Sequence, residues 1–421
     1  MNLTFASIIN SKPGLKCIAI LILTFEFSSS ANTQSIYKDY LLSSNGSNVF
    51  GLYDSLSGFY KKNPLGKPYI NRIEFRTQTD EFRLDRQEYT LRLRTSNPFN
   101  NSFQNKINQL EQSKIEFLKG AQFADKLYLK YKVISKFETL KSKIKYLDEE
   151  KLLNQKLVLL YKEAIFFQGK EDLEKYYEST LKLNKAESEI ADAKFEYDQL
   201  QSEIFADKTH VDAMTKSLNI IVINKYINEY REQNTGFENE LINSEISKSK
   251  LELDQKRSND NKILDHIQLQ YQSDPKDIIE KKLSLGVGIR IPQLIANRYQ
   301  KEEYQLNLFK LKIEKEEYED KKANRIGTLK TKINRLNNLN EFLISQTNAM
   351  NTLYNTDSLL TKGFYDAELL LQVKLQENRA KQQIDDLNSE AINLFIDFLY
   401  YTDHFYFQPK YYYLTIPFQE M

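Results

Sequence analysis

The sequence of 421 residues contains no tryptophan, one cysteine and three histidines. A single cysteine excludes an intramolecular disulfide framework and a metal site built from several cysteines. The histidines, His210, His266 and His404, are scattered along the chain, which argues against a histidine-rich metal site. No P-loop, HExxH or GxSxG motif occurs, and the Gly-x-Gly of LGVGIR lacks the third glycine of a dinucleotide-binding turn. These absences predict a protein without cofactor, metal or enzymatic activity.

Glycine and proline are also scarce, with 12 and 8 residues. Such a chain has few residues suited to the many turns of compact domains, which favours long uninterrupted helices. A hydrophobic fraction of 41% argues against wholesale disorder. The formal net charge of +1 gives no electrostatic reason to expect nucleic acid as a partner. The composition therefore predicts a mainly α protein.

Long apolar runs are missing as well, and the strongest one covers only residues 17–25. It follows Lys12 and Lys16 and precedes small residues at 28–31, which is the order of a secretory signal peptide. We expect this signal to cover residues 1–31; the alternative is a buried N-terminal segment. The run is much shorter than the ~20 apolar residues of a membrane-spanning helix. A secreted chain of this kind is soluble, or it meets a membrane by other means.

The rest of the chain contains a tandem repeat with an offset of 194 residues. Each copy has two alternating segments that end at a proline, Pro98 in the first copy and Pro292 in the second. The same offset matches Gly169 with Gly363. It also matches apolar strand residues, Ile73 with Ile267, Phe75 with Leu269, Leu91 with Leu285 and Leu93 with Val287. We therefore expect a first repeat at 32–225 and a second at 226–421.

Each repeat is predicted to contain two strands followed by two long helices. Strands are expected at about 69–79, 86–97, 263–273 and 281–291. Helices are expected at about 99–168, 170–205, 293–362 and 364–400, followed by an aromatic tail at 401–421. A helix of about 70 residues is roughly 105 Å long, so such helices must pack on each other along their length. An ordinary solvated coiled coil would explain the helices equally well, but not the strands.

The predicted strands alternate between apolar and polar residues, and their lengths are close to the ~9–11 residues that a tilted strand needs to cross a bilayer. The apolar face suits lipid and comprises Phe75, Leu91, Leu93, Leu269, Leu285, Val287 and Ile289. The polar face suits a water-filled lumen and comprises Glu74, Arg76, Arg92, Arg94, Ser284 and Arg290. Four strands cannot close a barrel, but three chains would supply twelve. The alternative is an ordinary half-buried pair of hairpins in a soluble sheet.

Three further features are the arginines of the polar face, His266 and the aromatic tail. The arginines of the polar face would favour anionic permeants, or they are merely solvated strand charges. His266, beside a strand, is expected to be structural and not a ligand. The aromatic tail, including residues 405–418, is expected to pack on the helices as an extra strand, or to contact a membrane interface.

At this point the sequence resembles the outer-membrane efflux protein family, the TolC-like ducts. The resemblance covers essentially the whole chain after residue 31. It is most specific in LSLGVGIRIPQLIANRYQKEEYQLNLFKLKIEKEEYE, similar to the last strand, its proline and the following helix of the family. The segment TKGFYDAELLLQVKLQENRAKQQIDDLNSEAINLFIDFL resembles the periplasmic tip and the returning helix.

The resemblance implies a homotrimer with a 12-stranded outer-membrane β-barrel, continued by a periplasmic α-helical barrel. Such a duct passively conducts substrates in tripartite efflux or type I secretion, with a periplasmic adaptor and an inner-membrane transporter as partners. The alternative function is a secreted periplasmic coiled-coil structural or adaptor protein.

The resemblance also assigns positions. Pro98 and Pro292 match the strand-to-helix proline of the family, and Gly169 and Gly363 match its tip glycine. The acidic residues that constrict the tunnel of the family fall here on Leu369 and Gln372. Asp172 and Asp366 are two other candidates for the constriction; alternatively, they are ordinary acidic residues at helix N-termini, favoured there by the helix dipole.

Overall fold

The structure is a computed structural model, and it describes a large part of the chain. The described residues are 37, 39–43, 48–62, 68–79, 87–97, 99–168, 170–205, 218–231, 236–272, 282–290, 294–353, 366–414 and 419–420. The predicted signal at 1–31 and the four predicted turning residues, Pro98, Gly169, Pro292 and Gly363, lie outside them. Among the described residues, no helix is both long and apolar enough to cross a membrane.

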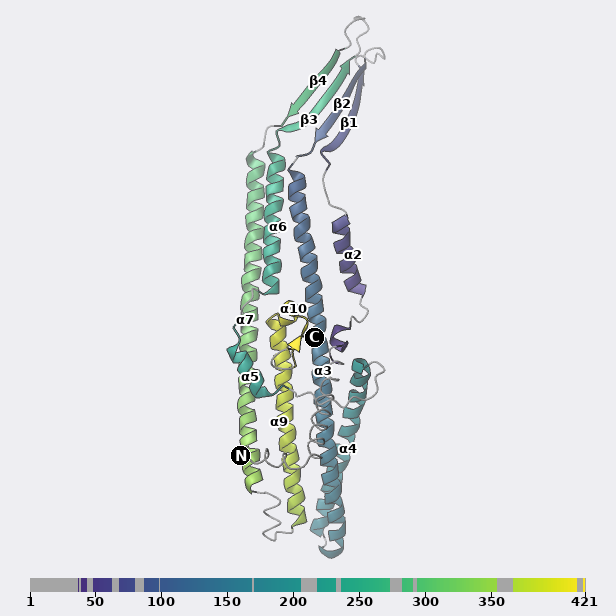
Figure 1. The fold of residues 1–421 in the computed structure, drawn as a ribbon, viewed down its shortest axis with the longest axis vertical. Coiled ribbons are helices and arrows are strands. Elements are labelled where there is room, and N and C mark those ends of the chain that lie inside the picture. The colour runs from purple at the N-terminus through teal and green to yellow at the C-terminus, as the bar shows by residue number, and fades with distance from the viewer. Residues whose placement is uncertain are drawn as a thin grey trace, which may run out of the picture. The chain divides into compact units, whose positions relative to one another are not determined.

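The described chain is mainly helical, with a small antiparallel sheet (Figure 1). The helices are α2 (Asn48–Lys62), α3 (Asn100–Gln168), α4 (Lys170–Phe205), α5 (Ile220–Glu229), α6 (Phe237–Asp260), α7 (Leu294–Leu353), α9 (Ala367–Tyr401) and α10 (His404–Phe407). The strands are β1 (Ile70–Thr79), β2 (Gln87–Thr95), β3 (Leu264–Gln272), β4 (Lys282–Ile289), β5 (Tyr411–Tyr412) and β6 (Gln419–Glu420).

Long helices form where the sequence lacks helix breakers. Helix α3 contains 69 residues and α7 contains 60, and neither includes a proline. Gly120 and Gly327 are their only glycines, and a single glycine costs a helix only about 1 kcal/mol. Helices α2, α5 and α6 were not predicted, because the repeat gave no separate signal for them.

The described chain divides into two compact units. Unit 1 comprises Met1–Asn45, Phe123–Gln233 and Ala323–Met421, and unit 2 comprises Gly46–Gln122 and Asn234–Lys322. Each unit combines segments from both predicted repeats, so the compact units do not follow the repeat boundary near residue 225. Helices α3 and α7 contribute residues to both units.

Unit 2 contains a four-stranded antiparallel sheet in the order β1-β2-β3-β4. The central pair joins the two repeats, since Leu91 of β2 lies opposite Leu269 of β3. The outer pairs place Phe75 opposite Leu91 and Leu269 opposite Leu285. Residues related by the 194-residue offset therefore lie in the same cross-strand row.

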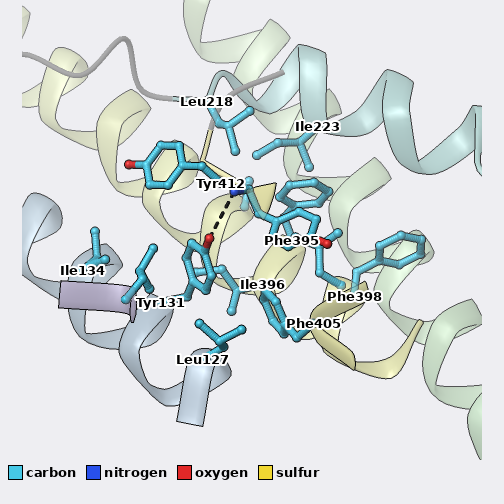
Figure 2. Close-up of a cluster of buried hydrophobic side chains, with 14 of the residues drawn as sticks. Leu127, Tyr131, Ile134, Leu218, Ile223, Phe395, Ile396, Phe398, Phe405 and Tyr412 are labelled. Atoms are coloured by element: carbon cyan, nitrogen blue, oxygen red, sulfur yellow. Dashed lines mark hydrogen bonds between the residues drawn. The ribbon is translucent and has the colours of Figure 1, made fainter. Parts of the chain in front are cut away.

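Unit 1 is built around an aromatic core (Figure 2). Its fully buried side chains include Tyr37 and Leu41 of the N-terminal segment, Leu127, Tyr131 and Ile134 of α3, Ile220 and Ile223 of α5, Ile333 of α7, Phe395, Ile396, Phe398 and Leu399 of α9, and Phe405, Tyr412 and Tyr413 of the C-terminal segment. These residues pack α5, α9 and the C-terminal segment together with α3.

The aromatic tail packs on the helices of unit 1. The Tyr131 ring stacks on Phe405 with ring centroids 5.1 Å apart. The Tyr131 hydroxyl donates to the carbonyl of Tyr411 at 3.1 Å and accepts from the backbone N–H of Tyr413 at 3.2 Å. Among the described tail residues, strand pairing is limited to the short β5–β6 bridge, and Phe405, Tyr412 and Tyr413 are buried in the core of unit 1.

The buried phenols predict a loss of stability at alkaline pH. Burial raises the pKa of Tyr131 and Tyr413 well above the ~10 of an unfolded tyrosine. The native state therefore holds protons that the unfolded state releases, so this stability is present below pH ~10 and is lost as the pH rises further. Circular dichroism and phenolate absorbance, followed together, should show buried tyrosines ionising only as helix is lost. Complete phenolate formation in a still helical protein would contradict this.

Candidate functional site: a sheet with one apolar and one charged face

The four strands place their apolar side chains on one face. Directly opposed residues of an antiparallel sheet share a face, and successive residues of a strand alternate faces. The register therefore collects three apolar rows: Ile73, Leu93, Ile267 and Val287; Phe75, Leu91, Leu269 and Leu285; and Thr77, Tyr89, Tyr271 and Leu283. Every strand residue predicted to face lipid belongs to this face or, for Ile289, continues its alternation along β4.

This apolar face is uncovered in the single chain. Phe75 is 64% exposed and Leu285 is 73% exposed, although both belong to a regular sheet. Full burial of one such side chain contributes about 1.5–3 kcal/mol, so a whole exposed face represents a large unrealised stabilisation. The face is therefore suited to contact an apolar phase or another apolar surface.

The opposite face is polar and charged. Its rows are Arg72, Arg94, His266 and Gly288; Glu74, Arg92, Gln268 and Gly286; and Arg76, Thr90, Gln270 and Ser284. Five of the six residues predicted to face a lumen are thus brought together on one face. The sixth, Arg290, follows the last residue of β4, whereas the alternation predicts it inside the strand. The ladder is irregular between Leu264 and His266, which ends the regular pairing there, although the Arg290 N–H still donates to the carbonyl of Ile263 at 2.8 Å.

A cluster of ion pairs organises the charged face around Glu74. Its Oε1 lies 3.0 Å from Nε of Arg94 and 3.3 Å from Nε of Arg72. Its Oε2 accepts from Nη2 of Arg76 at 3.1 Å. Three guanidinium groups therefore share one carboxylate. The spacing of residues 72, 74 and 76, each two apart in one strand, is the sequence signal for the β1 part of this cluster.

Arg92 uses a neutral partner instead. Although it lies opposite Glu74 in the register, its Nη2 donates to Oε1 of Gln268 at 2.9 Å. Gln268 in turn donates from Nε2 to Oε1 of Gln270 at 3.3 Å. The charge of Arg92 is consequently not offset by this contact.

His266 has a structural role in the sheet. Its Nδ1 lies 3.1 Å from Oδ2 of Asp265, and its ring occupies the space above Gly288. A Cβ at Gly288 would collide with the imidazole, whereas a Cβ at Gly286 would meet Gln268 at an ordinary 3.7 Å. The glycine of β4 therefore makes room for the histidine of β3.

The structure describes the side chain of one of the two candidate constriction residues, Asp366, but not that of Asp172. Asp366 is the N-cap of α9, and its carboxylate accepts from the backbone N–H of Leu369 at 3.2 Å. That contact favours the helix-terminal alternative for Asp366. Asp172 belongs to α4, and its side chain is outside the described part.

The first turn of α9 carries another carboxylate, which the sequence pattern did not single out. Glu368 pairs with Lys175 of α4 at 3.2 Å and accepts from Gln372 at 3.0 Å. No cluster of three or more His, Cys, Asp or Glu side chains suited to a metal occurs in the described ranges.

Solved structures with the same architecture were found. The outer membrane protein VceC of Vibrio cholerae superimposes with a TM-score of 0.57 at 10% identity, covering 88% of this chain and 96% of VceC. The Campylobacter jejuni CmeC outer membrane channel gives a TM-score of 0.51 at 9% identity, covering 88% of this chain and 85% of CmeC. A membrane protein from Pseudomonas aeruginosa gives 0.51 at 10% identity, covering 89% and 90%. No protein-family model matches the sequence, and no curated protein matches it.

The chain therefore has the fold of outer-membrane channel proteins. More specifically, it is the fold of the TolC-like outer-membrane factors, and the resemblance drawn from the sequence is confirmed at the level of the fold.

The two glycines of β4 give a matched test of the charged face. We expect Gly288→Ala to lower stability by about 1 kcal/mol, because the new methyl group must displace the His266 imidazole, whose side chain is 19% exposed. Gly286→Ala should change stability much less, since the same methyl group meets only an ordinary contact. Thermal unfolding of the purified protein measures both. The double variant Gly288→Ala/His266→Ala should recover most of the loss, and equal stability of the two single variants would exclude the proposed packing.

Proposed function

We propose that the protein is an outer-membrane duct, which passively conducts substrates from the periplasm to the exterior in a tripartite efflux or type I secretion system. The observation that carries this proposal is the sheet with one exposed apolar face and one charged face. A lipid phase would cover the first face and a water-filled lumen would solvate the second. The shared fold with outer-membrane channels supports the same function.

The sheet requires other chains for closure. Strands β1 and β4 form its two edges, and open edges are not tolerated in lipid because their backbone groups lack partners. Three copies joined edge to edge would give a twelve-stranded barrel, which is within the known range for outer-membrane barrels. The four strands contain 8 to 10 residues, close to the ~9–11 that cross a bilayer at a tilt. A homotrimer is therefore part of the proposal.

Helix α7 supports the same oligomer. Tyr299, Leu306, Phe309 and Ile313 are each more than half exposed, and their spacings of seven, three and four residues follow a heptad. Such a stripe of apolar side chains on a helix is the surface that a neighbouring helix covers in a coiled coil. A second copy of the chain offers that neighbouring helix in a symmetric helical barrel.

The partners follow from the proposed class. A duct has no energy source of its own, so a periplasmic adaptor and an inner-membrane transporter would deliver substrate to the periplasmic end. The predicted signal at 1–31 would take the chain across the inner membrane, and the helical part would extend into the periplasm. Neither an enzymatic activity nor a cofactor is part of this proposal.

The second candidate is a secreted periplasmic coiled-coil structural or adaptor protein. The long polar helices α3 and α4 favour it, since helices of that kind occur in soluble coiled coils. It leaves the exposed apolar face of the sheet unexplained.

Fractionation and oligomer stability test the duct. We expect the protein in the outer-membrane fraction, as a trimer that heat dissociates. Phe309→Gln should weaken the trimer more than tenfold, because burying one phenylalanine contributes about 1.5–3 kcal/mol. Lys301→Gln, an exposed position on α7 outside the apolar stripe, is the matched control and should leave the trimer unchanged. Recovery of monomer in the soluble periplasmic fraction would contradict the proposal.

Neighbouring positions of β4 test the two faces. Leu285→Cys should react with a lipid-phase maleimide, and Ser284→Cys should react with a membrane-impermeant one, because successive strand residues face opposite sides. The only native cysteine, Cys17, lies in the predicted signal, whose removal would leave the introduced thiol as the only one in the mature chain. Equal labelling of both positions by the impermeant reagent would instead favour the second candidate.

A further inference from the structure

The charged face of the sheet has an unequal balance of charge. Strands β1 and β2 contribute Arg72, Arg76, Arg92 and Arg94, against the two carboxylates of Glu74 and Glu88. On the same face, strand β4 contributes Lys282, opposite Gln272 in the row of Glu88, together with Ser284 and the two glycines Gly286 and Gly288, which have no side chain. Positive charge thus predominates on this face.

The arrangement around Glu74 presents more positive charge to solvent than the number of charged residues alone suggests. The Glu74 side chain is only 7% exposed, whereas those of Arg72, Arg76 and Arg94 are 69%, 60% and 42% exposed. The carboxylate therefore lies beneath the guanidinium groups, and a solute approaching the sheet meets the arginines first. One carboxylate also offsets only one of the three positive charges around it.

Arg92 adds a further positive charge to this surface. Its hydrogen-bond acceptor, Oε1 of Gln268, belongs to a neutral amide, which orients the guanidinium without neutralising it. Glu74 is accordingly a positioning residue for Arg72, Arg76 and Arg94, and Gln268 is one for Arg92. Both hold the guanidinium groups close to the sheet.

We propose that the strand region of the duct selects anionic solutes, with Arg72, Arg76, Arg92 and Arg94 forming its selective lining. The proposal rests on the proposed function, since it requires the charged face to line a water-filled pore. Three copies would place twelve arginines around one lumen, where low-dielectric walls focus their field and concentrate counter-ions. The substrate class is small solutes that carry carboxylate or phosphate groups, for which guanidinium donors are suited.

Ion selectivity of the purified protein tests this. The trimer is inserted into planar bilayers of neutral phosphatidylcholine, and the reversal potential is measured under a KCl gradient. Because this lipid has no net charge, a preference for chloride reports on the protein. We expect chloride to permeate better than potassium, and Arg92→Gln to lower the permeability ratio about threefold or more.

Arg92 suits this test because it is not one of the arginines paired with Glu74, so its replacement leaves those ion pairs in place. Arg92→Lys keeps the charge and should keep the selectivity. An open pore that prefers potassium, or a chloride preference unchanged by Arg92→Gln, would overturn the inference and leave the duct intact. Absence of any conductance from an assembled trimer would overturn both.

Discussion

The pairing of β2 with β3 is the contact on which the rest of the sheet depends. It joins residues 87–95 to residues 264–272, which belong to different copies of the repeat. Because the side-chain period of a strand is two, a slip of one residue would exchange the apolar and charged faces of half the sheet. The register with Leu91 opposite Leu269 keeps the apolar rows continuous across all four strands. One pairing thus makes two short hairpins into a single two-faced surface.

The two faces place opposite demands on their surroundings. The apolar face is stabilised only when water is removed from it, while the arginines around Glu74 lose hydration free energy if they are buried without partners. A wall between lipid and water satisfies both demands at once. A soluble sheet would satisfy both only if another apolar surface covered its apolar face, and Phe75 and Leu285 of that face are exposed in the described part of the chain.

The helical part is stabilised differently. Helices such as α7 are polar over much of their length, so their packing depends on concentrated apolar contacts. In unit 1 the C-terminal segment supplies many of these contacts, with Phe405, Tyr412 and Tyr413 buried against α3 and α9. Tyr131 connects the two by a ring contact and by hydrogen bonds to the tail backbone. The tail is therefore a structural part of the helical region.

The sequence by itself determined the elements with strong local patterns. Alternation located the four strands and their faces, the scarcity of glycine and proline indicated the long helices, and the 194-residue offset related the two halves. Helices α2, α5 and α6 were not predicted, because neither their periodicity nor the repeat distinguished them from the long helices. Only the tertiary structure decided that all four strands form one sheet, that Arg94 reaches Glu74 from the next strand, and that His266 occupies the space above Gly288. The physical reason is that local patterns fix the direction of a side chain, whereas its partners depend on pairing between segments far apart in the chain.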